Sequence, residues 1–426
     1  MSDLKTKKRI VIVGGGFAGL NFAYQLFRNK HYHVTLLDKN NYNYFTPLLY
    51  QVATSFLEPS SISYPFRKLF RKKDIEFRMG ELKKVDPGSR TIDLSDGTTL
   101  TYDHLVFAAG AKTNFYGIDS IRQNALSLKG IDDALRMRNA MMKTLEQASI
   151  TTDPIERKKL VTMVVAGGGP TGVEVAGMLA EMKNYIMGKD YPELIGAGGK
   201  IYIIDGGPAL LAPMSDKTHK ETYDALVGLG VEVKLNTHVS DYSNGQVRLG
   251  TGEIIEANTL IWAAGITAHT FEGIPAGSLG PGKRMLTDSF NKVQGLENVW
   301  AIGDISIQFT DDAYPKGHPQ QAQPAIQQGR TLAKNFIAMA KGRPPKPFKY
   351  FDRGDMAIVG RHHAVVDLFK HKVHVKGIIA LFIWLFIHLI SLVNVHNKLR
   401  TLYNWAVAYM TRDQTLRMIF GTSRDV

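Results

Sequence analysis

Two glycine-rich segments carry the spacing of dinucleotide-binding sites. In the first, RIVIVGGGFAGL, the glycines follow an apolar stretch, and the next apolar stretch ends in an acid. The first glycine of this pattern makes a tight turn, the second lets the backbone approach a pyrophosphate, and the third packs a helix on a strand. The acid accepts hydrogen bonds from ribose hydroxyls. The cofactor-binding residues predicted here are Gly14, Gly15, Gly16, Gly19, Asp38 and Lys39.

The pattern returns in LVTMVVAGGGPTGVEVAG, with Gly167, Gly169 and Gly172, and the following strand KIYIID ends in Asp205. The 33 residues from Gly172 to Asp205 are more than usual, which indicates an inserted turn and loop. An acid followed by GG, with no nearby arginine, repels a 2′-phosphate, so NAD is favoured over NADP. Two such sites about 150 residues apart predict one flavin and one nicotinamide dinucleotide.

Three further strand ends fit the same cofactors. The segments YDHLVFAAGA and ANTLIWAAGI end in small residues, Ala109 with Gly110 and Ala264 with Gly265. Turns made of alanine and glycine let a flat cofactor pass close to the backbone. The segment NVWAIGDI places Asp304 where a carboxylate can accept hydrogen bonds from ribityl hydroxyls. Each is also compatible with an ordinary strand end, but their order along the chain favours cofactor contacts.

These motifs resemble the type II NADH dehydrogenases, which are single-subunit, non-proton-pumping NADH:quinone oxidoreductases of the two-dinucleotide-binding flavoprotein superfamily. FTPLLYQVATSFLEP, AGGGPTGVEVAG, AQPAIQQG and GDMAIVGRHHAVVD carry the resemblance, which covers nearly the whole chain. It implies an α/β fold with two Rossmann-like, disulfide-reductase-like domains and a C-terminal membrane-associated helical region. It also implies FAD as cofactor, NADH as substrate and a membrane quinone, menaquinone or ubiquinone, as electron acceptor. Ser55 and Asp355 depart from the residues often found in the family, glycine and serine.

The domain boundaries expected from these motifs divide the chain into four parts. An FAD-binding domain is split between 1–115 and 270–340, with an NADH-binding domain at 116–269 inserted between its two parts. Residues 341–426 form the predicted membrane-anchoring region. The chain has no cysteine, so the cysteine chemistry of disulfide reductases and of sulfide:quinone reductases is excluded.

The glutamines of QQAQPAIQQGR are candidates for binding an uncharged carbonyl substrate. Gln323 and Gln327 lie four residues apart, on one face of a helix that we expect from Gln323 to about Lys341, because Pro324 suits the first helical position. The positive end of that helix, pointed at the flavin, would stabilise the anion formed on reduction. In the family these two glutamines line the quinone pocket. The alternative is a helix start with solvated amides.

Three other residues take their predicted roles from the resemblance. In relatives, a glutamate at Glu174 lies by the nicotinamide and the flavin, where it holds the carboxamide or tunes proton delivery. The alternative is an acid that interacts favourably with the helix dipole. FTPLLYQVA is expected to wrap the flavin ring, with Thr46 and Gln51 as contacts, although either residue can instead serve packing. The catalytic set predicted is Glu174, Gln323 and Gln327.

The C-terminal region is basic and apolar. From Lys341 onward there are 14 Lys or Arg and 5 Asp or Glu, which is +9 of the total +13. The apolar run Gly377–Ile387 is short for a spanning helix, basic residues flank it, and LRTLYNWAVAYM forms a second amphipathic segment. These features favour an anionic lipid surface over nucleic acid. The alternative is a pair of core helices or a dimer interface.

The expected location is peripheral on the cytoplasmic face of the cell membrane, because no apolar signal region precedes the first strand. A homodimer is expected from relatives, and no metal site is expected, since His362, His363, His388 and His396 match no metal spacing. Two rival functions remain open: a soluble ferredoxin-reductase-like flavoprotein, and an NADH-sensing flavoprotein without significant turnover.

Overall fold

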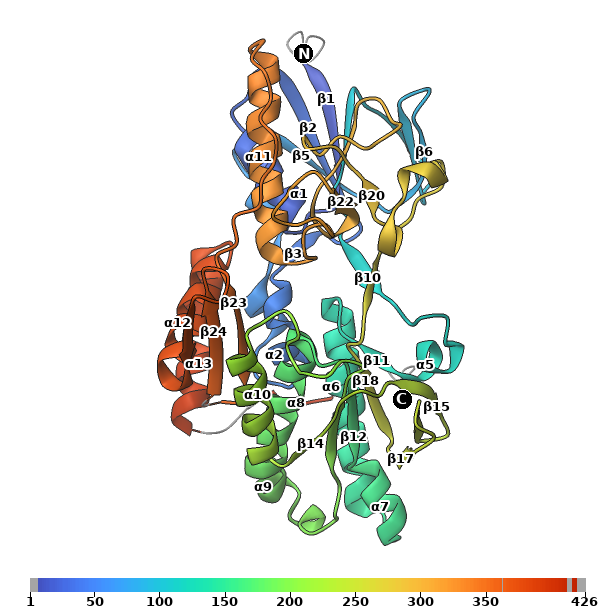
Figure 1. The fold of residues 1–426 in the computed structure, drawn as a ribbon, viewed down its shortest axis with the longest axis vertical. Coiled ribbons are helices and arrows are strands. Elements are labelled where there is room, and N and C mark those ends of the chain that lie inside the picture. The colour runs from blue at the N-terminus through green and yellow to red at the C-terminus, as the bar shows by residue number, and fades with distance from the viewer. Residues whose placement is uncertain (1–6, 362, 412–415, 420–426) are drawn as a thin grey trace. The chain divides into compact units, whose positions relative to one another are not determined.

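The computed structural model describes residues 7–361, 363–411 and 416–419, which form two compact units (Figure 1). The first unit contains the chain up to Tyr44, Tyr64–Lys112 and Ile266–Asp352. The second contains Phe45–Ser63, Thr113–Gly265 and the chain from Arg353 onward. Each unit is therefore assembled from segments that lie far apart in the sequence.

The first unit is built on a five-stranded parallel sheet with the order β21-β9-β1-β2-β5. Its strands are short apolar runs, and Ile10 and Ile12 of the central strand are fully buried. Helices α1 and α11 pack together so closely that a Cβ on Gly329 would collide with the Ala18 carbonyl. These elements are β1 (Lys8–Val13), α1 (Phe17–Leu26), β2 (Tyr32–Asp38), β5 (Ile75–Met79), β9 (His104–Phe107), β21 (Val299–Ala301) and α11 (Ala322–Ala340).

Smaller elements complete the first unit. A three-stranded antiparallel sheet has the order β6-β7-β8, and a short parallel pair joins β20 to β22. The bounds are α4 (Phe66–Leu69), β6 (Leu82–Asp86), β7 (Thr91–Leu94), β8 (Thr99–Thr101), η6 (Pro281–Lys283), β20 (Met285–Leu286), η7 (Gly303–Ile305) and β22 (Ser306–Ile307).

The second unit repeats the plan with a parallel sheet of order β11-β18-β12-β13-β14. An antiparallel sheet, β15-β16-β17, lies beside it in the same unit. The principal bounds are η2 (Thr46–Leu48), α2 (Leu49–Ala53), α3 (Pro59–Ile62), α5 (Asp119–Asn124), β11 (Leu126–Ser127), α6 (Ile131–Ile150), α7 (Pro154–Leu160), β12 (Met163–Ala166), α8 (Pro170–Met182), β13 (Ile201–Ile204), α10 (Asp216–Gly228), β14 (Val231–Lys234), β15 (Val239–Ser243), β16 (Gln246–Leu249), β17 (Ile254–Glu256) and β18 (Thr259–Trp262).

The C-terminal part of the second unit combines a sheet with two helices. Strands β23 (Asp355–Val359), β24 (His363–Leu368) and β25 (Val373–Lys376) form an antiparallel sheet, followed by α12 (Gly377–Ser391) and α13 (Val395–Thr411) (Figure 1). The sheet lies against α8, because a Cβ on Gly177 would meet the Gly360 backbone. The sequence predicted the two helices but not this sheet. Residues 412–415 and 420–426 of the predicted region lie outside the described residues.

The predicted α/β fold with two Rossmann-like units is confirmed, because each unit holds a parallel five-stranded sheet with a glycine turn after its central strand. None of the helices formed by the described residues is both long and apolar enough to cross a bilayer. Ser55, which stands where family members often have glycine, has a backbone conformation that favours glycine. Its φ of 62° lies in the left-handed region that favours glycine, and the residue is fully buried.

Candidate functional site

The first glycine turn lies between β1 and α1 and leaves room on one side only. Gly14 has φ 104°, and a Cβ there would collide with the Ala108 carbonyl. A Cβ on Gly19 would collide with the Gly14 carbonyl, so the start of the helix lies directly on the turn. At Gly16 no described atom lies within 4 Å of the Cβ position. The turn is thus closed toward the protein and open at Gly16, beside the free N–H groups of the helix.

Asp38, at the end of β2, holds this turn in place. Its Oδ2 accepts a hydrogen bond from the Gly15 N–H at 2.7 Å, and its Oδ1 accepts one from the Asn40 N–H at 2.8 Å. Burial raises the pKa of Asp38, while the two N–H donors and the charge of Lys39 act in the opposite direction. The Lys39 side chain is exposed. The carboxylate keeps further lone pairs for ribose hydroxyls.

The turn at Asp304 is held by two further glutamines of the QQAQPAIQQGR segment. The Gly303 N–H donates to Gln328 Oε1 at 2.6 Å, and Gln320 Nε2 donates to the Asp304 carbonyl at 2.8 Å. Gly303 has φ 77°, and a Cβ there would lie 3.1 Å from Cβ of Ala18. The structure therefore brings Asp304 to the same helix as the glycine turn. Ala109 and Gly110 follow β9, next to the Ala108 carbonyl that faces Gly14.

The helix that carries Gln323 and Gln327 runs from Ala322 to Ala340, one residue from the predicted start and end. Both glutamines are half-buried. The Gln327 side chain already makes two bonds: its Nε2 donates to the Phe351 carbonyl at 2.8 Å, and its Oε1 accepts from the Phe351 N–H at 3.0 Å. One Nε2 hydrogen remains for a substrate carbonyl.

The second glycine turn copies the first. Gly167 has φ 112°, and a Cβ there would lie 2.5 Å from the Ala263 carbonyl carbon. A Cβ on Gly172 would collide with the Gly167 carbonyl, whereas no described atom lies within 4 Å of the Cβ position at Gly169. Asp205 Oδ2 accepts from the Gly168 N–H at 2.6 Å, in the way that Asp38 accepts from the first turn. The structure thus places the predicted residues of this turn together.

The Ala264–Gly265 turn follows β18 and lies under a tyrosine. The Tyr116 hydroxyl donates to the Ala264 carbonyl at 3.1 Å, and a Cβ on Gly265 would collide with that hydroxyl. Tyr116 itself is 61% exposed and has a left-handed φ of 51°. A larger residue at position 265 would therefore displace the Tyr116 hydroxyl from this position.

Glu174 lies in α8 and is 8% exposed. Burial raises the pKa of Glu174 well above its usual value, and the Ile358 backbone N–H and the Trp384 side chain offset only part of that effect. The Trp384 indole N–H, on α12, makes no hydrogen bond of full geometry to any described residue. Burial thus favours the neutral form of the carboxyl, which lies against a surface formed by the C-terminal part of the unit.

Gln51 and Thr46 differ in their surroundings. Thr46 is exposed, whereas Gln51 is 3% exposed and both ends of its amide are engaged. Trp405 Nε1, on α13, donates to Gln51 Oε1 at 2.8 Å, and Gln51 Nε2 donates to the Tyr50 hydroxyl at 3.0 Å. This chain of bonds joins α2 to the last helix. A contact of Gln51 with the flavin stays a prediction.

The roles of two tryptophans in the site were not predictable from the sequence. Trp384 is fully buried, Trp405 is 3% exposed, and the Trp384 ring stacks on His388 with centroids 3.8 Å apart. Burial lowers the pKa of His388 to about 4. No local pattern in the sequence indicated that Trp384 lies against Glu174 and that Trp405 binds Gln51. His362 lies outside the described residues.

Residues 8–329 match the family described as pyridine nucleotide-disulphide oxidoreductase, and residues 353–418 match the NDH2 C-terminal domain. A type II NADH:quinone oxidoreductase of Mycobacterium tuberculosis, NdhA, is 34% identical over 95% of this chain and 88% of its own length. The chain belongs to the type II NADH:quinone oxidoreductase family. The expectation drawn from the motifs is thereby confirmed.

Two further relatives are less similar in sequence. An external NADH-ubiquinone oxidoreductase of Saccharomyces cerevisiae is 29% identical over 96% of this chain and 82% of its own length. The structure of NDH2 from Plasmodium falciparum in complex with NADH superposes with a TM-score of 0.88 at 23% identity, covering 97% of this chain and 100% of that one. At that identity the structural likeness supports the fold alone.

Proposed function

We propose that the protein oxidises NADH with FAD and passes two electrons to a membrane quinone, without pumping protons, at the start of a respiratory chain. The observation that carries this proposal is the pair of matching glycine turns, each closed toward the protein, open at one glycine and held by a strand-end carboxylate. Membership of the type II family supports the choice of substrates. The absence of cysteine leaves the flavin as the redox group.

The first unit fits FAD. The open side of the turn at Gly16 and the N-terminus of α1 suit a pyrophosphate, and Asp38 and Asp304 suit ribose and ribityl hydroxyls. When bound, FAD takes a hydride equivalent from NADH and passes electrons to the quinone, and the protein supplies position and electrostatics. Gln320 and Gln328 keep the Asp304 turn in place.

The second unit fits NADH. Gly169 offers the matching open position, and Asp205 is the acceptor for the adenosine ribose. Its negative charge disfavours a 2′-phosphate, so NADH is the preferred nucleotide. Glu174, whose pKa is raised by burial, is suited to hold the nicotinamide carboxamide or to supply a proton when the quinone is reduced.

Gln323 and Gln327 are proposed to bind the quinone carbonyl. Amides donate hydrogen bonds without exchanging protons, and Gln327 is already oriented by Phe351. Anaerobic reduction of the flavin by NADH, followed by addition of quinone, tests the function directly. We expect Gln323→Ala to leave reduction intact and to slow reoxidation about three- to tenfold, the size of one lost hydrogen bond. A native protein that NADH does not reduce, or that quinone does not reoxidise, would refute the function.

The C-terminal helices are proposed to lie on an anionic lipid surface at the cytoplasmic face of the membrane. One face of α12 is apolar and exposed, while the other, with Ala380, Leu381 and Trp384, is buried. Helix α13 also exposes apolar side chains. Exposed apolar residues are Ile378, Ile379, Phe382, Phe386 and Ile390 on α12, and Leu399, Leu402, Tyr403 and Met410 on α13. A homodimer stays a prediction, which light scattering on the detergent-extracted protein would measure.

A further inference from the structure

The loop from Asp205 to α10 belongs to the proposed NADH site and is fixed at several points. At its start, Asp205 Oδ1 accepts from the Gly207 N–H at 2.7 Å. In its middle, the Leu211 N–H donates to the Gly168 carbonyl at 2.8 Å. Leu211 is fully buried with a left-handed φ of 53°, a conformation that persists only where the surroundings impose it. The path of this loop therefore decides how Gly168 and Asp205 are presented.

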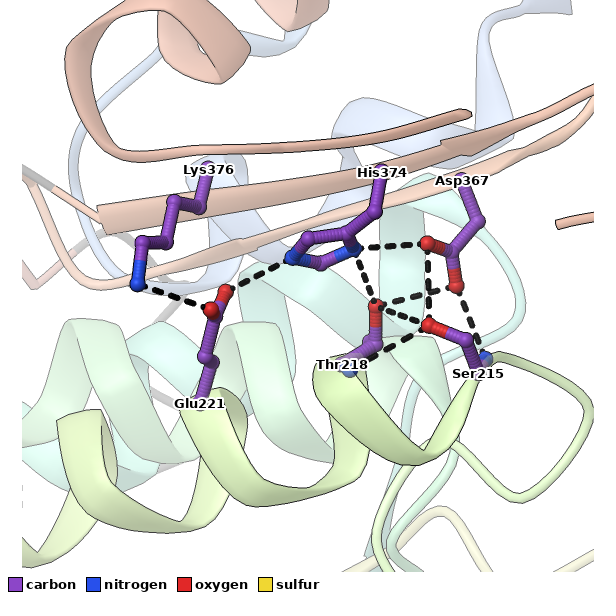
Figure 2. A network of polar contacts seen from close by, with 6 residues as sticks. All are labelled: Ser215, Thr218, Glu221, Asp367, His374 and Lys376. Atoms are coloured by element: carbon purple, nitrogen blue, oxygen red, sulfur yellow. Dashed lines mark hydrogen bonds and ion pairs between the residues drawn. The ribbon is translucent and has the colours of Figure 1, made fainter. Parts of the chain in front are cut away.

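The far end of the loop is held by the C-terminal sheet. Asp367 of β24 is fully buried and accepts from the Ser215 N–H at 2.8 Å, the Ser215 hydroxyl at 3.1 Å and the Thr218 hydroxyl at 2.9 Å (Figure 2). Ser215 is also the N-cap of α10, whose first turn it satisfies through the Thr218 N–H. A carboxylate from a distant strand thus completes the N-terminus of this helix, where negative charge is favourable.

His374 of β25 holds that carboxylate from the other side. Its Nδ1 lies 2.7 Å from Asp367 Oδ1, and its Nε2 lies 2.9 Å from Glu221 Oε2 (Figure 2). Lys376 Nζ lies 2.9 Å from the second Glu221 oxygen. Since both ring nitrogens face carboxylates, both carry protons and the ring is an imidazolium. Although serine, histidine and aspartate meet here, the ring has no lone pair with which to activate Ser215 as a nucleophile.

We propose that Asp367 and His374 are positioning residues for NADH, because through Ser215 they fix the loop that presents Asp205 and Gly168. The proposal rests on the proposed function of the second glycine turn. It gives the C-terminal region a role in nucleotide binding beside the role proposed for it at the membrane. Local sequence patterns could not predict this role, because Asp367 lies 152 residues after Ser215.

The contacts of Asp367 and His374 with Ser215, Thr218 and Glu221 are called the clamp below. The clamp depends on the protonation of His374. The charged groups that face His374 are Asp367 from β24, Glu221 from α10 and Lys376 from its own strand. Helix α12, which packs on the same strands, contributes one titratable side chain, His388, and its ring lies on Trp384. Burial lowers the pKa of His374, but the bonds to Asp367 and Glu221 outweigh this effect and leave the pKa raised.

The sign of the pH effect follows from the raised pKa. The charged ring holds the clamp fully below the unfolded pKa of histidine, near 6.5, and this contribution is lost as the pH rises through the higher folded pKa. The affinity for NADH is therefore expected to weaken as the pH rises above about 6.5 and the ring loses its proton.

The test measures the apparent Kd for NADH and the limiting rate of flavin reduction by stopped flow, in the full-length holoprotein from pH 6 to pH 9. We expect His374→Gln and Ser215→Ala to weaken NADH binding about five- to tenfold, the size of one ordinary hydrogen bond, with the limiting rate within about twofold of native. In His374→Gln the dependence of Kd on pH should flatten. His219→Gln, the same change on α10 outside the clamp, is the matched control.

The outcomes are distinguishable. A native protein that NADH reduces normally, with Kd and its pH profile unchanged in both His374→Gln and Ser215→Ala, would overturn the positioning role and leave the proposed function standing. The role would also be overturned if the extent of NADH binding and of flavin reduction fell only in proportion to the loss of folded protein, because that pattern marks general destabilisation. Failure of the native protein to be reduced by NADH would instead count against the function.

Discussion

The two glycine turns have nearly the same backbone conformation, whereas the helices that follow them pack on different parts of the chain. Gly14 and Gly167 have φ values of 104° and 112°, and the glycine two residues further on is open in both turns. Helix α1 packs on α11 of its own unit. Helix α8 instead packs on β23, which comes from the C-terminal region.

The difference shows most clearly two residues after the third glycine of each motif. In the first turn this position is Asn21, which donates to the Phe17 carbonyl and accepts from Arg330 Nε at 2.9 Å. In the second it is Glu174, buried against Ile358 and Trp384. The same backbone turn occurs in both units, but at this position only the second has an ionisable group, and residues of the C-terminal region contact it.

The largest effect is expected from a methyl group at the open glycine of each turn. Gly16 and Gly169 have φ values of −71° and −73°, which alanine adopts without strain, and no described atom obstructs a Cβ. The methyl group would displace the pyrophosphate, and a displacement of about 1 Å in such sites costs on the order of 10²-fold. Gly169→Ala should therefore slow flavin reduction by NADH by about that factor, while Gly16→Ala should lower FAD content.

Each variant is the control for the other, and thermal unfolding of both should stay close to native. If Gly16→Ala impaired NADH binding and left FAD content intact, the assignment of the two turns would be reversed.

An intermediate effect is expected from Glu174→Gln. If the protonated carboxyl supplies a proton during quinone reduction, its loss slows reoxidation by up to about 10²-fold and leaves the limiting rate of reduction by NADH unchanged. Because burial raises the pKa of Glu174, its contribution to stability is lost as pH rises through the folded pKa, so the native Tm should fall with rising pH. The variant should show a flatter profile. Slower reduction with normal reoxidation would indicate that the residue holds the carboxamide instead.

The smallest effect is expected on the exposed face of α12. Phe386 is 62% exposed, and burying such a ring in lipid contributes about 1.5–3 kcal/mol. Phe386→Ser should therefore weaken flotation with anionic vesicles about tenfold. The matched control is Ile155→Ser, since Ile155 is 79% exposed on α7. Equal binding of native protein and both variants would argue against the lipid face and for a core or interface role.

Local signals in the sequence predicted the parts of the site that depend on local structure. The glycine turns, the strand ends at Asp38 and Asp205 and the helix that begins near Gln323 all follow from spacing within a few residues of each element. The departure at Ser55 also marked a real feature, the left-handed position after α2.

The remaining contacts join segments that are far apart in the chain, and no local pattern encodes them. Trp405 reaches Gln51 across 354 positions, and Asp367 reaches Ser215 across 152. Apolar spacing could identify the amphipathic helices, but it could not show that Trp405 points inward. Nor could it show that the amide of Gln327 is engaged by the Phe351 backbone.

The division of each unit into three segments sets an order for its assembly on the ribosome. All segments of the first unit have been synthesised by Asp352, whereas the second unit needs the chain from Arg353 onward. Until those residues emerge, α8 and α10 lack the sheet that covers them, and such uncovered apolar surface favours aggregation. The nascent protein can therefore complete its first unit before the second, and a chain that ends before Asp367 lacks the contact that holds Ser215 at the far end of the loop before α10.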